Sequence, residues 1–359
     1  MLKNKIIHNK PFLGIEEANI AASIIESGWI AQGSKTKEFE DNICDYLYIK
    51  DNHAVAVSSG TAALFISLQI LNLPKYSEVI IPSYVCSALL NAIYMADLTP
   101  VLVDVNPIDF NIDINIIESK LSTKTKAIII PHIYGMPVDV EAFNSFKQKG
   151  IFIIEDCATA IGAKIGDDYV GTLGDVAIFS FYASKFITCG NGGMIVSKNL
   201  DLVSKARDYR DFDGVENYYK RFNFQITDIQ SAIGTEQLKK IDGFIERRKD
   251  FAQQYSDLCN KKGWDHQRPL HRDMHPNNYR FVVKLGKREI LDLKKYLLKE
   301  NIDSIIPIEK FELLHNYLKL DSNNYLNSEL LSETTLSIPV YPALLAFEFN
   351  YIIEVLNKY

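Results

Sequence analysis

The chain has 359 residues, of which 47% are hydrophobic and 23% charged, a balance typical of a globular protein with a large buried core. Its net charge of −6 and the lack of a dense basic run argue against nucleic-acid binding. Five widely spaced cysteines without a Cys-x-x-Cys pair, and seven histidines without metal-ligand spacing, indicate neither a disulfide framework nor a metal site.

The first segment, MLKNKIIHNKPFLG at residues 1–14, lacks an apolar core long enough for a signal peptide. No later run approaches the length of a membrane span. We therefore expect a cytoplasmic protein with no membrane contact.

Short apolar segments that predict strands alternate with helical stretches along the first half of the chain. The predicted strands are 53–57, 78–82, 99–105, 126–133, 151–156, 176–181 and 192–197. Helical candidates between them include 62–71, 87–96 and 140–150. Such alternation is typical of an α/β fold with a large, mostly parallel sheet sandwiched by helices, although one antiparallel edge strand would not be visible in this pattern.

The pattern changes after a predicted long helix at 234–255. A polar stretch at 260–278 leads to a strand at 279–285 and a helix at 289–301. We therefore predict two domains, a large α/β domain at 1–245 and a smaller C-terminal α+β domain at 246–359.

An acid and a lysine follow two of the predicted strands. Asp156 ends the apolar run IFIIED, so its carboxylate is expected at the carboxyl end of a buried strand, where ligands bind in open α/β sheets. Lys185 follows the run VAIFSFYA and precedes a glycine-rich turn at 190–193. Each residue alone has an ordinary interpretation, as a solvated lysine or a helix-capping aspartate. In this order, a lysine that forms a Schiff base and an acid that keeps a pyridine nitrogen protonated suit pyridoxal phosphate chemistry.

This order resembles the DegT/DnrJ/EryC1/StrS family of sugar aminotransferases, which belong to the fold-type I pyridoxal phosphate enzymes. The motif residues are Glu155-Asp156, Gly162, Phe179-Ser180-Phe181, Lys185 and Gly190 to Gly193. The resemblance implies that Lys185 carries the cofactor, Asp156 meets its pyridine nitrogen and Ser180 contacts its phosphate.

The segment Ser58-Ser59-Gly60-Thr61-Ala62-Ala63-Leu64 is similar to the family's phosphate-binding loop. Here a strand turns into an apolar helix, so free N–H groups and the positive end of the helix face an anion. An ordinary capped helix would look the same without the lysine segment downstream. The interpretation makes Gly60 and Thr61 cofactor-binding residues.

Two further segments extend the resemblance. Residues 223–232, NFQITDIQSA, resemble the family segment whose asparagine, here Asn223, reaches the cofactor site of the neighbouring subunit. The resemblance therefore implies a homodimer with shared active sites. The closing segment Leu336 to Pro342 is similar to the family's Leu-Pro-x-Tyr-Pro element.

Some positions depart from the family pattern. Cys86 stands where an aromatic residue usually stacks on the pyridine ring, and we expect it to lie against one ring face. Thr159 stands where glutamine or histidine commonly contacts the cofactor, and Gln225 stands where arginine is frequent. The usual His-Tyr-x-Pro-x-His stretch is degraded in residues 306–315. Because of these departures, the resemblance does not specify the substrate.

The resemblance implies transfer of an amino group, usually from L-glutamate, to a nucleotide-linked keto-sugar, commonly a 4-keto-6-deoxy hexose, for surface glycan assembly. Two alternatives remain at this point. Sugar dehydratases of the same family have histidine at the lysine position, which Lys185 argues against. A non-catalytic binding or regulatory role is the other, and the loss of the aromatic residue at Cys86 favours it slightly.

Overall fold

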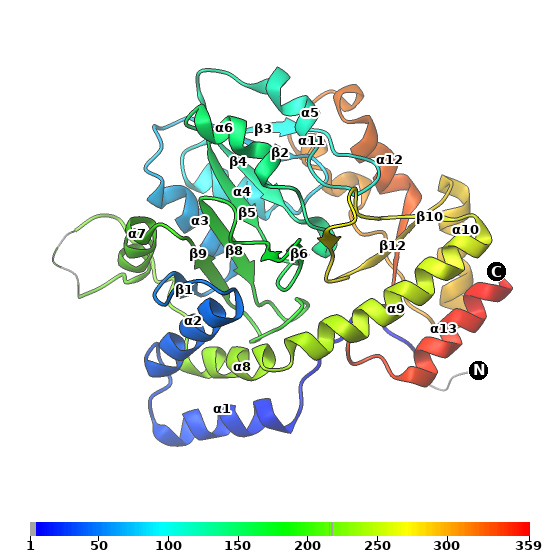
Figure 1. Cartoon of the computed structure of the whole chain (residues 1–359), viewed down its shortest axis with the longest axis horizontal. Coiled ribbons are helices and arrows are strands. Elements are labelled where there is room, and N and C mark those ends of the chain that lie inside the picture. Colours follow the sequence, from blue (N-terminus) through cyan, green and yellow to red (C-terminus); the bar gives the residue numbers. More distant parts are fainter. Residues whose placement is uncertain (1–4, 215, 217) are drawn as a thin grey trace.

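The structure is a computed structural model and describes residues 5–214, 216 and 218–359. Its main sheet has seven strands in the order β1-β9-β8-β5-β4-β2-β3 (Figure 1). Their bounds are β1 (Ala54–Val57), β2 (Glu78–Pro82), β3 (Thr99–Val103), β4 (Thr125–Pro131), β5 (Phe152–Asp156), β8 (Val176–Ser180) and β9 (Gly193–Val196). Neighbouring strands in the series β3, β2, β4, β5 and β8 pair in parallel. Strand β9 is antiparallel to its two neighbours, β1 and β8. All seven strands were predicted, but the antiparallel strand lies inside the sheet and not at its edge.

Helices cover both faces of this sheet. Alternate residues of β1 point to opposite faces of the sheet. Val55 and Val57 share a core with α3, α4 and α7, whereas Ala54 and Ala56 share a core with α2, α8 and α9. A strand buried on both faces reads as a continuous apolar run, as β1 does. The helices are α2 (Ser34–Tyr46), α3 (Gly60–Ile70), α4 (Ala88–Met95), α7 (Leu200–Arg210), α8 (Asp228–Leu238) and α9 (Ile241–Lys262).

The long helix predicted at 234–255 is wrong as a single element, because it is divided between α8 and α9 at Lys239 and Lys240. The two parts have different packing partners. Helix α8 packs against α1 (Ile15–Ser27) and α2, whereas α9 runs on to contact β12 (Phe281–Lys284) and α13 (Ala346–Lys358). Periodicity alone did not reveal the break, since both helices continue the same apolar spacing.

A smaller α+β region follows α9. Strands β10 (Asp265–His266), β12 (Phe281–Lys284) and β13 (Thr335–Ile338) form an antiparallel sheet, which shares a core with α9, α10 (Lys287–Lys299) and α13 (Ala346–Lys358). Ile6 joins this core and forms a bridge with Ile302. A domain boundary near residue 245 remains a proposal. Ile6, from the N-terminal segment, packs in the core of the smaller region.

The remaining strands and helices are short. Strands β6 (Lys164–Ile165), β7 (Asp168–Tyr169) and β11 (Met274–His275) form a third sheet. Short helices are α5 (Ile114–Ile117), α6 (Asn144–Gln148), α11 (Leu314–Tyr317) and α12 (Leu326–Thr334). Leu314 and Leu331 of the last two belong to the core around α3. Among the described residues, no helix combines the length and apolar character needed to cross a membrane.

Candidate active site

The predicted acid and lysine emerge at the carboxyl ends of neighbouring parallel strands. Asp156 is the last residue of β5, and Lys185 follows the end of β8 by one short turn, closed by the Lys185 N–H donating to the Tyr182 carbonyl at 2.8 Å. Side chains that leave adjacent parallel strands meet at one edge of the sheet. The fold therefore brings these two side chains to one site.

Asp156 and Lys185 both line a cavity of about 300 Å³. The walls come from the large sheet, the segment before α4, and the smaller C-terminal region. Other lining residues are Val85, Cys86, Ser87, Pro131, His132, Ile133, Tyr134, Ala158, Thr159, Ser184, Tyr279, Arg280, Pro307, Ile308, Glu312 and Tyr317. A cleft of this size between two regions is typical of a small-molecule site.

The Asp156 carboxylate is held at the cavity wall. Its Oδ1 accepts a hydrogen bond from the Ala158 N–H at 2.9 Å. Burial raises the pKa of Asp156 above its usual value, while the Ala158 N–H and the positive charge of Lys185 oppose that shift. A cationic partner in the cavity would favour the ionised carboxylate further.

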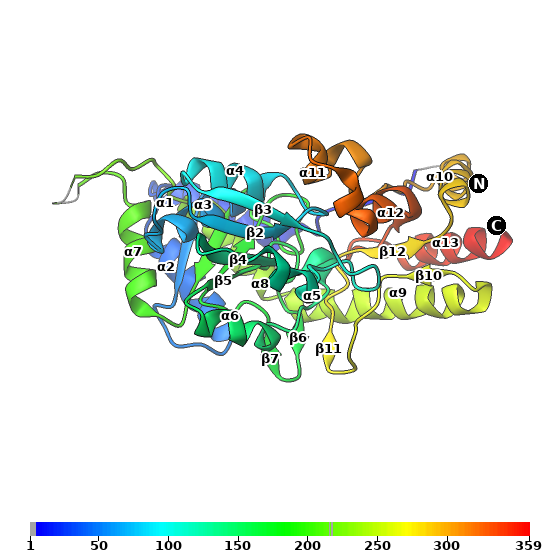
Figure 2. The same ribbon diagram turned by 90° about the horizontal axis from the view of Figure 1, so that it is seen from above.

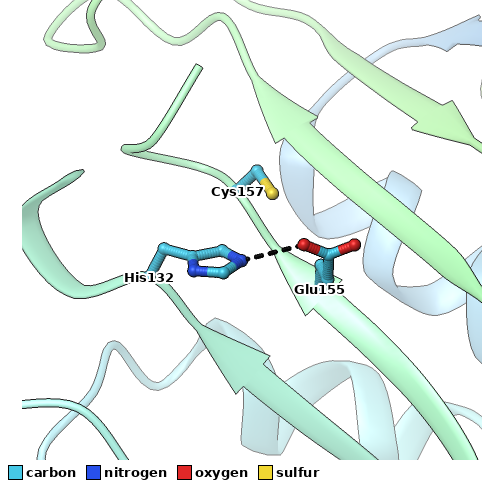
Figure 3. Close-up of side chains that lie close together, drawn as sticks. All are labelled: His132, Glu155 and Cys157. Carbon is cyan, nitrogen blue, oxygen red and sulfur yellow. Dashed lines mark hydrogen bonds and ion pairs between the residues drawn. The ribbon is translucent and has the colours of Figure 1, made fainter. Parts of the chain in front are cut away.

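His132, Glu155 and Cys157 form a buried cluster (Figure 3), and the last two flank Asp156 in the chain. The His132 Nε2 lies 3.1 Å from a Glu155 oxygen, and the Val138 N–H donates to His132 Nδ1 at 3.0 Å. Glu155 also accepts hydrogen bonds from three backbone N–H groups, those of Gly171, Leu173 and Gly174. Burial raises the pKa of the Cys157 thiol well above its usual value, so the thiolate form needed for a metal ligand is disfavoured. These bonds define a buried structural network that includes His132 of the cavity wall.

The predicted phosphate-binding residues lie together at the start of α3. Ser59 caps this helix, and its Oγ accepts from the Ala62 N–H at 3.1 Å. A Cβ at Gly60 would lie 2.7 Å from the Ser180 Cβ, so only glycine allows the helix to approach β8 this closely. Thr61 is exposed beside them. Gly60, Thr61 and Ser180 therefore form a group at the same edge of the sheet as Asp156, although they are not among the residues that line the 300 Å³ cavity.

Cys86 and Thr159 line the cavity as the sequence led us to expect for residues near the cofactor. Cys86 is exposed and precedes α4. The Thr159 hydroxyl already donates to the His132 carbonyl at 3.1 Å. Their contacts with a cofactor stay predictions.

Asn223 is not among the residues that line the cavity of its own chain. It is exposed on the segment that follows α7 at one end of the molecule (Figure 2), and the carbonyl of the next residue, Phe224, accepts from the Ser58 N–H at 2.8 Å. The Asn223 Oδ1 accepts from the Gln225 N–H at 3.0 Å. This position is compatible with a role in a neighbouring subunit, which stays a prediction.

Several polar residues of the cavity wall were not predicted from the sequence. His132 could have been found, because it directly follows the apolar run of β4 just as Asp156 ends that of β5. The others come from loops and from the smaller region, and no periodicity marks them. These residues are Tyr134, Tyr279, Arg280, Glu312 and Tyr317.

An acid that ends one parallel strand, a lysine one turn beyond the neighbouring strand, and a capped helix N-terminus beside them are the arrangement of a pyridoxal phosphate-dependent aminotransferase of fold type I. The chain belongs to the DegT/DnrJ/EryC1/StrS aminotransferase family, whose sequence model matches residues 12–357. This confirms the resemblance and the fold class predicted from the sequence.

Individual relatives match over nearly the whole chain. The chain is 31% identical over 362 aligned positions to GDP-perosamine synthase of Escherichia coli O157:H7, covering 98% of this chain and 97% of that protein. The aminotransferase TlmJ from Streptoalloteichus hindustanus has a TM-score of 0.91 at 26% identity, with 98% of each chain covered. The apo-form of the putative sugar aminotransferase Spr1654 from Streptococcus pneumoniae has a TM-score of 0.91 at 25% identity, covering 99% of this chain and 97% of that chain.

Proposed function

We propose that this enzyme transfers an amino group from L-glutamate to the keto group of a nucleotide-linked sugar, with pyridoxal 5′-phosphate as cofactor. The observation that carries the proposal is the shared cavity of Asp156 and Lys185. The 31% identical relative is named for a nucleotide-linked amino sugar, which supports this substrate class. A 4-keto-6-deoxy hexose is the acceptor that we favour, and surface glycan assembly is the use that we expect for its product.

The residues present fit pyridoxal phosphate at both of its ends. At the ring end, Asp156 offers an anion for a protonated pyridine nitrogen, and Lys185 offers a primary amine for the aldehyde. At the phosphate end, the Ser59 side chain accepts a hydrogen bond from the Ala62 N–H, and its carbonyl accepts one from the Ala63 N–H. The first two N–H groups of α3 can therefore bind an anion.

A second glycine shapes the phosphate end. A Cβ at Gly193 would lie 2.3 Å from the Ser59 carbonyl oxygen, so a side chain there would push the loop away from β9. Together with Gly60, this residue leaves space for the backbone to form an anion cradle. The fit supports the assignment of Gly60, Thr61 and Ser180 to the phosphate.

When bound, the cofactor supplies an electron sink for negative charge at the carbon that bears the amino group. The Lys185 Nζ removes the proton from that carbon of the donor and returns a proton to the acceptor, because it is the amine available in the cavity. The Asp156 carboxylate holds the proton on the pyridine nitrogen. The surrounding apolar wall, including Val85 and Ile308, excludes water from these proton transfers.

We further propose a homodimer in which Asn223 of one subunit completes the partner's site. Asn223 is exposed between α7 and α8, and it is not among the residues that line the cavity of its own chain. Aromatic side chains near it are exposed as well, including Phe212, Tyr218 and Phe222. An isologous interface would bury these side chains and build two equal sites.

The test uses the purified protein loaded with pyridoxal phosphate. A visible absorbance band should change on addition of L-glutamate and recover on addition of the correct nucleotide-linked keto-sugar, and the product mass should show replacement of oxygen by an amino group. Lys185→Ala serves as the inactive control, and Lys205→Ala on α7 as the matched active control. A band that ignores every amino donor would contradict the proposal and favour a binding or regulatory role.

A further inference from the structure

The backbone carbonyl of Ser184, the residue directly before Lys185, accepts hydrogen bonds from two side chains. The Tyr279 hydroxyl donates to this oxygen at 2.9 Å, and the Asn9 side-chain amide donates to it at 2.9 Å as well. Tyr279 lies just before β12 in the smaller region, whereas Asn9 belongs to the N-terminal segment. Two parts of the chain that are distant in the sequence therefore meet beside the lysine of the site.

The peptide group that joins Ser184 to Lys185 is held at both of its polar atoms. Its N–H donates to the Tyr182 carbonyl at 2.8 Å, and its carbonyl oxygen is held by Tyr279 and Asn9. Because a peptide group is planar, fixing both atoms fixes the position of the Lys185 Cα. The direction in which the Lys185 side chain enters the cavity therefore depends on these bonds.

Tyr279 is itself a rigid anchor for that peptide group. Its side chain is buried in one core with Phe186, the residue after Lys185. Its N–H donates to Asn277 Oδ1 at 2.9 Å, and its carbonyl accepts from Arg248 Nη1 at 2.8 Å. The Arg248 guanidinium carbon also lies 4.7 Å from the ring centre of Phe186. Because the backbone and the ring of Tyr279 are both held, its hydroxyl is fixed in one place.

The same segment of the smaller region also holds the loop that follows Asp156. The Asn277 side-chain amide is buried, and it donates to the carbonyls of Thr159 at 3.1 Å and Ile161 at 2.9 Å. The segment therefore contacts both the loop after β5 and the turn after β8. As a result, Asp156 and Lys185 are held relative to one short piece of chain.

We propose that Tyr279 is a positioning residue that directs the Lys185 amine through the Ser184 carbonyl, and this inference rests on the role of Lys185 in the proposed function. The amine must meet the cofactor aldehyde and then the reacting carbon, so a small change in its direction lowers the rate. Such a change leaves sugar binding untouched, because the Tyr279 hydroxyl is engaged with the backbone. Removal of this hydroxyl should therefore slow the chemistry of Lys185 at an unchanged KM.

The test follows Lys185 directly, in the full-length protein freed of cofactor. Lys185 forms a carbon–nitrogen double bond with the aldehyde of added pyridoxal 5′-phosphate and releases water, and the rise of the visible absorbance band gives the rate constant. Turnover of the loaded enzyme then gives kcat and the KM of the keto-sugar. The variant Tyr279→Phe removes the hydroxyl and keeps the ring in its core.

Two further variants separate positioning from a general loss of stability. Tyr255→Phe is the matched control, because the Tyr255 hydroxyl also donates to a backbone carbonyl at 2.9 Å, that of Pro339, and its ring is buried in the core of the smaller region. Asn9→Ala removes the second donor to Ser184, and Asn9 is only half-buried. This variant decides the question if Tyr279→Phe does not fold.

We expect Tyr279→Phe to lower both the rate constant for cofactor attachment and kcat by about 10-fold, the factor that corresponds to one hydrogen bond. The KM of the keto-sugar should not change. Asn9→Ala should lower the same rate constant by about 3-fold, because water can replace a donor that is half-exposed. Tyr255→Phe should match the wild type.

An unchanged rate constant in Tyr279→Phe, or in Asn9→Ala if the first variant does not fold, would overturn the inference. Equal slowing in Tyr255→Phe would indicate a general loss of stability and overturn it as well. So would a rise in KM at unchanged kcat, because it would assign the hydroxyl to the substrate. Failure of the proposed function has a different signature, since the wild type would then attach the cofactor but aminate no sugar, while the rate constants would still report on Tyr279.

Discussion

The backbone N–H of His132 donates to the backbone carbonyl of Asp156 at 3.1 Å, one residue beyond the last pair of the β4–β5 ladder. This bond fixes the ends of the two strands together at the point where the acid of the site emerges. Beneath it, the His132 side chain contacts Glu155. The geometry of Asp156 therefore depends on its neighbours in a buried network, and the first two predictions follow from this.

Asp156→Asn should lower turnover by at least about 100-fold, because a neutral amide removes a preorganised charge from the site. The amide retains a carbonyl oxygen for the Ala158 N–H, so the fold should persist. Single-turnover absorbance with glutamate measures the effect, and Asp168→Asn on the exposed end of β7 is the control. Full activity of Asp156→Asn would show that another group holds the proton on the pyridine nitrogen.

Glu155→Gln should destabilise the protein by about 3 kcal/mol, since an amide donor would face backbone donors in a buried site. The carboxylate accepts from Gly171, Leu173 and Gly174, and no water-exposed alternative is near, because Glu155 is fully buried. Urea unfolding at pH 7 measures the change. A free energy of unfolding equal to that of the wild type would contradict the role assigned to this network.

Cys86 should react with a thiol reagent far faster than the other four cysteines, because it is the exposed one among the five. Bound pyridoxal phosphate should slow this reaction by about 10-fold or more if Cys86 lies against the ring, since access controls thiol reactivity. Cys86→Ser should abolish the fast phase, and Cys86→Phe should still bind the cofactor. Equal labelling rates with and without cofactor would place Cys86 away from the ring.

Asn223 can be tested by complementation between two inactive variants. If it acts across the subunit boundary, a mixed dimer of Lys185→Ala and Asn223→Ala contains one site with both native residues. An equal mixture that exchanges subunits should then recover about a quarter of wild-type activity, given two sites per isologous dimer. Sedimentation checks that each variant is a dimer, and Asn357→Ala is an exposed control on α13. No recovery on mixing, or a fully active monomer, would contradict the shared site.

His8 should make the fold sensitive to acid. Its pKa is lowered to about 3 in the folded chain, first by burial and then by Arg280 and Arg248, whereas the unfolded chain has the ordinary value of 6.5. The unfolded state therefore binds one more proton between these values, and stability is lost as pH falls below 6.5. Between pH 7 and pH 5 the loss should be about 2 kcal/mol, from 1.36 kcal/mol per pKa unit.

His8→Gln should remove this part of the pH dependence and keep a hydrogen bond to Ser337, which lies 2.9 Å from the His8 ring. Denaturant unfolding at pH 7 and pH 5 measures the difference, with the exposed His271→Gln as control. If the free energy of unfolding of His8→Gln still fell between pH 7 and pH 5 as it does in the wild type, the imidazole would not be buried in its neutral form.

Local sequence patterns predicted the strands of the main sheet and the acid and the lysine that follow two of them. Apolar runs such as IFIIED and VAIFSF are buried on both faces, so local composition marks them, and the acid and the lysine follow them directly in the chain. The capped glycine turn at the start of α3 is local in the same way. Neighbouring residues dictate such features, and distant contacts change them little.

The distant residues that complete the wall of the cavity depend on how the folded chain brings its segments together. Arg280 and Glu312 lie more than a hundred residues beyond Asp156 in the chain, and nothing periodic marks them. The break between α8 and α9 has the same cause, because different packing partners divide one continuous apolar pattern. The burial of the Arg280 Nε in the cavity wall depends on how the two regions meet, which no single segment of the sequence encodes.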